Sequence, residues 1–221
     1  MAISKFTGTA ASGFASWLNS NKAGTFLEGC TITDGEPITI TKGDSVFSYR
    51  HDNVYSQTGR ISFTNGKTSI EKTCEVGNAQ LNVYYSWLCN NGLFLRFWEW
   101  RQTQSTSWYG DGDGSVILYC NDNNKLSAII RGGHYGETQP NKWYIVDGDS
   151  PVQTSLEFTP DLTADRTILA NPNYNDGTDG IALPHIFFAT QSNYTDVESQ
   201  LSHSTMNEID YITNGGWFIE N

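Results

Sequence analysis

The feature that most constrains the fold is a pair of apolar segments, residues 81–87 and 93–100, which flank Asn90-Asn91-Gly92. Large side chains alternate along both segments, which predicts two strands, and the glycine-containing turn between them predicts a β-hairpin. Successive side chains of a strand point to opposite faces, so Phe94 and Leu95 lie on different sides of the second strand. Because both faces carry large apolar groups, we expect this strand to lie centrally in a sheet that is packed on both sides.

Tight turns between short apolar segments continue along the chain after residue 25. Asn65-Gly66 and Asn214-Gly215 each lie between two such segments, and residues 121–125 join another pair. Asn-Gly is the preferred pair for a tight hairpin turn, since both central residues take φ > 0. Short, closely spaced segments of this kind predict an all-β fold, an antiparallel β-sandwich-like architecture with one short N-terminal helix.

The helix is predicted from an apolar stripe near the N-terminus. Phe14, Trp17 and Leu18 follow the i, i+3, i+4 spacing of a helical face, and residues 19–21 supply an end. In one interpretation, the stripe docks onto a sheet of the same chain. In the other, the helix is an N-terminal arm that grips a neighbouring subunit.

Composition divides the chain into three parts. Residues 1–158 hold the helix and the main antiparallel β-sandwich, and residues 159–180 form an Asn-, Pro- and Gly-rich loop. Residues 181–221 contain the C-terminal strands and a closing hairpin, which we expect to belong to the same domain.

Pro184 predicts that the strand over residues 181–190 lies at a sheet edge or contains a bulge, because proline lacks the N–H that a ladder requires. Long loops tend to be functional, so we expect the loop to lie against a partner.

The charge balance excludes several classes of partner. Lys and Arg total 13 against 24 Asp and Glu, which gives a formal net charge of −11. Nucleic acids and anionic membranes bind through clustered Lys and Arg, so we expect neither as a partner. No apolar segment approaches the ~20 residues that span a bilayer. The N-terminal segment also lacks the hydrophobic core of a signal peptide, so we expect cytoplasmic synthesis without classical export.

The cysteines predict thiols that are not paired. Cys30, Cys74, Cys89 and Cys120 are widely spaced and include no C-x-x-C pair. Four cysteines allow three pairings, and nothing in the spacing selects one of them. Structural disulfides belong mainly to exported proteins, and no export signal is found here. We expect free, buried thiols.

Turns rich in Asp and Asn raise the alternative of a calcium site, because calcium binds oxygen ligands. Their positions are residues 111–114, 121–124, 147–149 and 176–179. Asp111 and Asp113 begin the spacing of a calcium-binding loop, but Val116 stands where that loop requires glycine. Asp, Asn and Gly also favour turns through their backbone preferences alone. We therefore expect no cofactor and keep calcium as the alternative.

The sequence contains no catalytic motif. It lacks G-x-S-x-G, H-E-x-x-H, a P-loop and G-x-G-x-x-G, and its histidines are far apart. Glu99 lies between Trp98 and Trp100, a setting that suits a glycosidase acid, but glycoside hydrolysis needs a second carboxylate opposite the first. We expect no enzymatic activity and assign neither a catalytic residue nor a metal ligand.

One aromatic pair is expected at the surface. Trp108 and Tyr109 lie in a polar loop just before Asp111 and Asp113. Aromatic rings offer stacking surfaces to the apolar faces of sugars, and Asp side chains accept hydrogen bonds from sugar hydroxyls. Trp and Tyr are equally enriched in protein interfaces. These four residues are therefore predicted contacts for a ligand or for a protein partner.

The last third of the chain resembles minor structural proteins of tailed bacteriophages. The resemblance rests on Ile181-Ala-Leu-Pro-His-Ile-Phe-Phe188 and on the closing Asp210-Tyr-Ile-Thr-Asn-Gly-Gly-Trp-Phe-Ile219, an aromatic hairpin after an acidic, Asn-rich middle. It implies a subunit of a virion head, neck, tail or baseplate that is made in the host cytoplasm. The implied partners are other virion subunits and copies of the same chain.

Two functional hypotheses follow from the sequence. The first is a non-enzymatic structural subunit of a phage-like virion, which acts through subunit packing and pairs its exposed strand edges with other chains. The side chains predicted to contact other subunits are Phe14, Trp17, Tyr174 and Trp217. The second is a carbohydrate-binding β-sandwich for host or glycan recognition, with Trp108 and Tyr109 as its contact surface.

Overall fold

The computed structural model describes residues 3–8, 11–51, 58–75, 83–98, 114–131, 143–149, 154–156, 168–169, 181–183, 185–188, 202–206, 209–214 and 217–221. Within these ranges the chain forms one helix, α1 (Ala11–Asn21), and every strand pairing is antiparallel. The predicted all-β, sandwich-like fold with a short N-terminal helix is therefore confirmed.

Three sheets make up most of the fold. The central sheet contains, in spatial order, β1 (Ser4–Gly8), β7 (Val83–Leu88), β8 (Gly92–Trp98), β9 (Gly114–Cys120), β10 (Leu126–Arg131), β11 (Trp143–Val146) and β12 (Thr154–Leu156). The N-terminal sheet contains β2 (Thr31–Thr33), β3 (Ile38–Lys42), β4 (Ser45–His51), β5 (Thr58–Thr64) and β6 (Ser69–Glu75). The C-terminal sheet contains β15 (Ile186–Phe188), β18 (Trp217–Glu220), β17 (Ile209–Asn214) and β16 (Ser202–Met206). A further pair joins β13 (Ile168–Leu169) to β14 (Ile181–Ala182).

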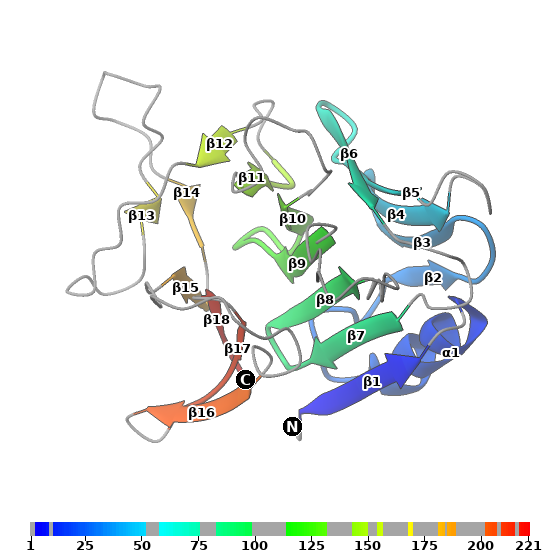
Figure 1. The fold of residues 1–221 in the computed structure, drawn as a ribbon. Coiled ribbons are helices and arrows are strands. Elements are labelled where there is room, and N and C mark those ends of the chain that lie inside the picture. The colour runs from blue at the N-terminus through cyan, green and yellow to red at the C-terminus, as the bar shows by residue number, and fades with distance from the viewer. Residues whose placement is uncertain are drawn as a thin grey trace, which may run out of the picture.

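The central sheet is packed on both faces. Figure 1 shows the N-terminal sheet, in blue to cyan, and the C-terminal sheet, in orange to red, on either side of the green central strands. Leu93 and Leu95 of β8 lie in a cluster with the N-terminal sheet, whereas Phe94 between them lies in a second cluster with the C-terminal sheet. The alternation along β8 therefore separates two cores, and the predicted central strand with two packed faces is confirmed.

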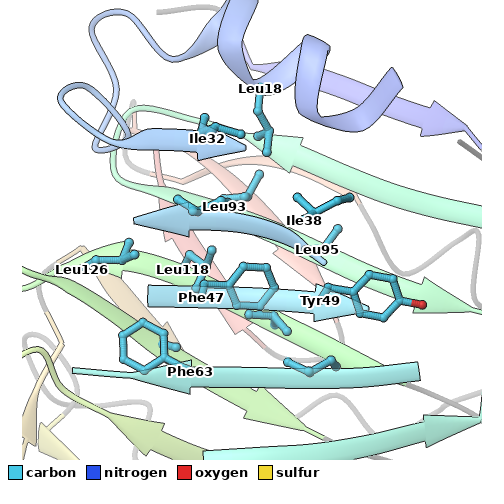
Figure 2. Close-up of a cluster of buried hydrophobic side chains, with 14 of the residues drawn as sticks. Leu18, Ile32, Ile38, Phe47, Tyr49, Phe63, Leu93, Leu95, Leu118 and Leu126 are labelled. Carbon is cyan, nitrogen blue, oxygen red and sulfur yellow. The ribbon is translucent and has the colours of Figure 1, made fainter. Parts of the chain in front are cut away.

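The larger core lies between the N-terminal and central sheets. Figure 2 shows Phe47 and Phe63 of the N-terminal sheet packed together with Leu95 and Leu118 of the central sheet. All four side chains are at most 1% exposed. Removing a side chain of this size from water contributes roughly 1.5–3 kcal/mol, so this interface is a major source of stability.

The helix α1 docks onto its own chain, as the first interpretation predicts. Phe14 and Leu18 are buried in the larger core, and the Phe6 ring of β1 lies 5.5 Å from the Phe14 ring. The Trp17 ring is partly buried against the same core, and its Nε1 donates a hydrogen bond to Ser4 Oγ at 3.1 Å. The helix ends at Asn21 as predicted, where the Asn21 side chain donates to the Trp17 carbonyl at 2.8 Å.

The C-terminal sheet approaches the central sheet closely at Gly92. A Cβ atom on Gly92 would lie 2.7 Å from Ile219 Cγ2, so only glycine leaves room for this side chain. Nearby, Asn91 Nδ2 donates to the Glu220 carbonyl at 3.0 Å. The backbone N–H of Asn221 also donates to the Asp210 carbonyl at 2.8 Å. The bond from Asn91 ties the end of the chain to the β7–β8 turn, and the bond from Asn221 ties it to β17.

The predicted hairpins are present, with one difference of register. The turns at Asn65-Gly66, at residues 121–125 and at Asn90-Asn91-Gly92 each join paired strands. In the closing hairpin, Asn214 pairs with Trp217, so residues 215 and 216 connect the strands in place of the predicted Asn214-Gly215. Gly-Gly is also accepted by tight hairpin turns, so the last residue of β17 is free to remain in the ladder.

The continuous strand predicted over residues 181–190 is wrong. The described residues form two short strands, β14 and β15, which pair with different partners. His185 between them has φ 62°, a left-handed conformation that interrupts an extended strand. β15 does lie at an edge of the C-terminal sheet, as Pro184 predicted. β13 falls within the predicted loop 159–180, whose other residues lie outside the described ranges.

Candidate functional site

Four turns converge at one end of the larger core, two from the N-terminal sheet and two from the central sheet. They are the β3–β4, β5–β6, β9–β10 and β11–β12 turns. Between them is a cavity of about 600 Å³, which we name the turn pocket. It is lined by Lys42, Gly43, Asp44, Ser45, Asn65, Gly66, Lys67, Asn124, Lys125 and Gly148. The pocket therefore spans both sheets and depends on their packing.

The β3–β4 turn is specified by one glycine. Lys42 pairs with Ser45, which leaves Gly43 and Asp44 as the two central residues. Gly43 has φ 59°, and a two-residue hairpin with a left-handed glycine first is the pattern of a type II′ turn. This turn places Asp44 at the rim of the pocket and Ser45 deeper, with 2% of its surface exposed.

Asn65 links the N-terminal sheet to the central sheet. Its Oδ1 accepts hydrogen bonds from the backbone N–H groups of Lys67 at 2.9 Å and Thr68 at 2.7 Å, which closes the β5–β6 turn. Its Nδ2 donates to the Asp147 carbonyl at 2.7 Å, on the β11–β12 turn. Because Asn65 is only 4% exposed, these bonds are shielded from water and hold the two turns in register.

Two of the predicted Asp- and Asn-rich turns meet beside the pocket. Asn121 Nδ2 donates to Asp147 Oδ1 at 3.1 Å and to Asp149 Oδ2 at 2.9 Å, and Asn123 Nδ2 donates to the same Asp149 oxygen at 2.7 Å. Lys125 Nζ lies 2.7 Å from Asp149 Oδ1. Hydrogen bonds from Lys125, Asn123 and Asn121 lower the pKa of Asp149 to about 2. Side-chain donors thus occupy this carboxylate.

Metal-binding side chains do not gather in the part of the chain that the structure describes. Within it, no three His, Cys, Asp or Glu side chains form a cluster that could hold a metal ion. The turns at residues 111–114 and 176–179, with Asp111 and Asp113, lie outside that part. Calcium therefore stays an alternative for those two turns.

The three lysines of the turn pocket differ in their partners. Lys42 Nζ donates to the Phe26 carbonyl at 3.2 Å, to Cys120 Sγ at 3.2 Å and to Asn124 Oδ1 at 2.7 Å, all neutral groups. Lys67 Nζ donates to the Asp149 backbone carbonyl at 3.1 Å. Among the described residues, Lys125 alone of these lysines forms a salt bridge. The charges of Lys42 and Lys67 therefore face the cavity without a bound carboxylate.

The outer face of the C-terminal sheet carries a second feature, a mainly apolar surface that we name the C-terminal face: the exposed Ile209, the half-buried Tyr211 and Phe218, and Glu220, which pairs with Tyr211. Ile212 and Ile219 are fully buried against the central sheet, so their strand neighbours Tyr211 and Phe218 point the other way. The Tyr211 and Phe218 rings meet edge to face, 6.3 Å apart. Ile209 is 38% exposed, the one large exposed hydrophobic side chain among the described residues.

The outer face of the N-terminal sheet is different in character. The Ser48 and Ser62 hydroxyls are 2.6 Å apart across β4 and β5, and Arg60 forms a salt bridge with Glu71 at 2.6 Å. Such polar cross-strand pairs are typical of a solvated sheet face. The two outer layers of the protein thus differ, since one is polar and the other presents aliphatic and aromatic groups.

The predicted contact residues are only partly placed by the structure. Those that lie outside the described residues are Trp108, Tyr109, Asp111, Asp113 and Tyr174. Trp217 belongs to β18, but its side chain is not described. Phe14 is 1% exposed and Trp17 packs against the core of its own chain, so neither ring is available as an outer contact surface in this structure. The proposed assembly surface therefore does not include Phe14 or Trp17.

The described cysteines are free thiols, as predicted. Cys30 and Cys89 are buried and Cys120 is half-buried, whereas the side chain of Cys74 is not described. Burial raises the pKa of Cys30 and of Cys89 to about 11. Burial also raises the pKa of Cys120, against the opposing effect of its hydrogen bond from Lys42. These thiols therefore stay protonated at neutral pH.

Comparison with known proteins adds no relative to this description. No protein-family model, curated protein or solved structure matches the chain. In the described ranges, the helix is neither long nor apolar enough to cross a membrane.

Sequence reasoning identified the components of the turn pocket without their convergence. It predicted turns at residues 65–66, 121–125 and 147–149, each from its own Gly, Asn and Asp content. Nothing in those turns indicates that they meet, because their meeting depends on how two sheets pack. The aromatic closing hairpin was a signal for the C-terminal face, but which of its sides is exposed depends on the packing of Ile212 and Ile219.

Proposed function

We propose that the protein is a non-enzymatic structural subunit that assembles through its C-terminal face, as part of a phage-like virion. The observation that supports this function is the apolar outer surface formed by Ile209, Tyr211 and Phe218. Tyr and Phe side chains are enriched in protein interfaces, and exposed apolar groups on a sheet face gain stability when a second surface covers them.

The edges of the same sheet support the proposal in a second way. β15 and β16 are the two edge strands of the C-terminal sheet in the described structure. An edge strand presents backbone N–H and C=O groups that a strand from another subunit can pair with. A face and an edge that adjoin give a neighbouring subunit both apolar contact and directional hydrogen bonds. The placement in a virion rests on the resemblance of residues 181–221 to phage structural proteins.

Self-association measured by sedimentation velocity tests this function. We expect the purified chain to form oligomers whose fraction rises with concentration, and Tyr211→Lys to weaken the association about tenfold or more, because the interface would then bury a charged side chain in place of an aromatic ring. Thr39→Lys is the matched control, since it adds the same charge to the outer face of the N-terminal sheet, and it should leave association unchanged. A monomer at every concentration, or equal effects of the two variants, would refute the proposal.

The carbohydrate-binding alternative depends on residues outside the described ranges. It is tested by a glycan array with the wild-type protein and with Trp108→Ala, which should lose binding while its circular dichroism spectrum is retained. If the wild-type protein gives no signal at high concentration, this surface is not a glycan site. The two functions are compatible, because recognition modules are often carried on particles.

A further inference from the structure

Ser45 is a largely buried polar residue whose hydroxyl has no partner among the described residues. It is 2% exposed and lines the turn pocket. Its hydroxyl makes no hydrogen bond to any of the described residues. Buried hydroxyls nearly always have a partner, because an unpaired one has lost its hydrogen bonds to water without replacement. Its partner is therefore a group within the pocket, either water or a ligand.

The charges around that cavity favour an anion. Lys42, Lys67 and Lys125 line it together with one carboxylate, Asp44. Asp149 lies outside the lining, where it accepts hydrogen bonds from Asn121, Asn123 and Lys125. The lining contains three lysines and one carboxylate, and Asp147 and Asp149 beside it act on Lys125, which leaves Lys67 as the lysine open to an anion. An entering anion meets Lys67, whose ammonium group donates only to the Asp149 backbone carbonyl, whereas the three donors of Lys42 are taken by neutral partners.

The remaining lining groups favour a ligand that also carries hydroxyls. Asp44 accepts no hydrogen bond from the described residues, so its oxygens are open to donors. Ser45 donates or accepts, and the Asn124 amide offers a further polar group beside Lys42. A purely anionic ligand would be repelled by Asp44, whereas a ligand with hydroxyl groups donates to it. The volume of about 600 Å³ is that of a small-molecule site.

We propose that the turn pocket binds a small hydroxylated anion, with the chemistry of an acidic monosaccharide such as a uronic acid. Lys67 binds the anionic group at the rim, Asp44 accepts hydrogen bonds from the hydroxyls, and Ser45 donates to them or accepts from them. Asn65 acts as a positioning residue, since its bonds keep the β5–β6 turn against the β11–β12 turn. This site deepens the carbohydrate alternative at a new position and does not depend on the assembly function.

Nuclear magnetic resonance titration of the ¹⁵N-labelled chain tests the site directly. The probes are glucuronate, glucose, which has the hydroxyls without the acid, and sulfate, which has the charge without the hydroxyls. We expect glucuronate to shift the amide signals of Gly43, Gly66 and Gly148 in a saturable way. Glucose and sulfate should bind about tenfold more weakly or not at all, since each lacks one set of partners.

Variants assign the binding to named groups. Lys67→Gln should weaken glucuronate binding about tenfold, because it removes a charge-assisted hydrogen bond, and Ser45→Ala about threefold. Lys72→Gln is the matched control, since Lys72 lies outside the pocket with its Nζ 3.7 Å from the centre of the Tyr144 ring. Thermal unfolding of each variant verifies that the fold is retained.

Three results would overturn the inference. They are the absence of saturable shifts with glucuronate, an equal response to glucose or to sulfate, and equal binding by the Lys67→Gln variant. The self-association assay uses a different surface and different variants. A failure of this site and a failure of the assembly function are therefore distinguishable.

Discussion

Replacing Gly92 with alanine is the most direct test of how the C-terminal sheet is seated. The new Cβ would lie 2.7 Å from Ile219 Cγ2, 3.1 Å from Ile219 Cδ1 and 3.4 Å from the Leu118 carbonyl oxygen. Carbon atoms in contact prefer about 3.5–4.0 Å, so Ile219 must move by about 1 Å. Ile219 is fully buried in the second core, which has little room for such a shift.

The expected cost is that of an overpacked core. We expect Gly92→Ala to lower the free energy of unfolding by about 1–3 kcal/mol. The measurement is urea unfolding followed by tryptophan fluorescence, with the midpoint compared at an unchanged slope. Gly13→Ala is the matched control, because its Cβ would lie 3.6 Å from Phe6 Cζ, an ordinary contact. Within α1 that change should instead stabilise the protein by about 0.5–1 kcal/mol.

A double mutant separates steric conflict from other effects of Gly92→Ala. Ile219→Ala alone should cost about 2–5 kcal/mol through loss of buried surface and the cavity left behind. With both changes, the methyl group added at position 92 occupies part of that cavity, so the combined cost should be lower than the sum by about 1 kcal/mol or more. Additive costs, or a Gly92→Ala variant as stable as the wild type, would show that the two sheets do not meet at Gly92.

Two further predictions concern titratable groups. Burial raises the pKa of Cys30 and Cys89 to about 11, so both thiols should react with iodoacetamide at pH 8 far more slowly in the native protein than in urea, as measured by mass spectrometry; equal rates would contradict the burial. The pKa of Asp149 is lowered to about 2, so its contribution to stability is present above pH ~4 and is lost as the pH falls towards 2. Carboxyl signals followed by nuclear magnetic resonance should give this low value in the wild type and a higher one in Lys125→Gln; the same pKa in both proteins would show that Lys125 is not its main cause.

Most of the turns were predictable from the sequence, because turn preferences are local. Asn65-Gly66 and residues 121–125 were predicted as hairpin turns because the backbone preferences of Asn and Gly act within a few residues. In the closing hairpin the same reasoning was one residue in error, because two glycines follow Asn214 and local preference does not distinguish between the two registers. Over residues 181–190 it missed the break at His185, whose left-handed conformation has no clear local signal.

The candidate site was not predictable in the same way. Lys42, Asn65 and Asp147 are far apart in the sequence, yet the Asn65 side chain bonds the Asp147 carbonyl and all of their turns surround one cavity. Each lysine reads as an ordinary surface residue when it is taken alone. The burial of Ser45 likewise results from packing. A serine beside a turn gives no indication in the sequence that it will be 2% exposed.

The amino-acid sequence by itself determined the strands, most of the turns between them and the two apolar faces of β8, because side-chain alternation and turn preferences operate within a few residues. The tertiary structure alone decided that three sheets stack, that Gly92 admits Ile219, and that four turns enclose a pocket. Those arrangements depend on which apolar surfaces cover one another over long separations in the chain. The hydrophobic effect is non-directional and stabilises any arrangement that removes apolar area from water. Only the packing of the whole chain therefore selects one arrangement of the sheets.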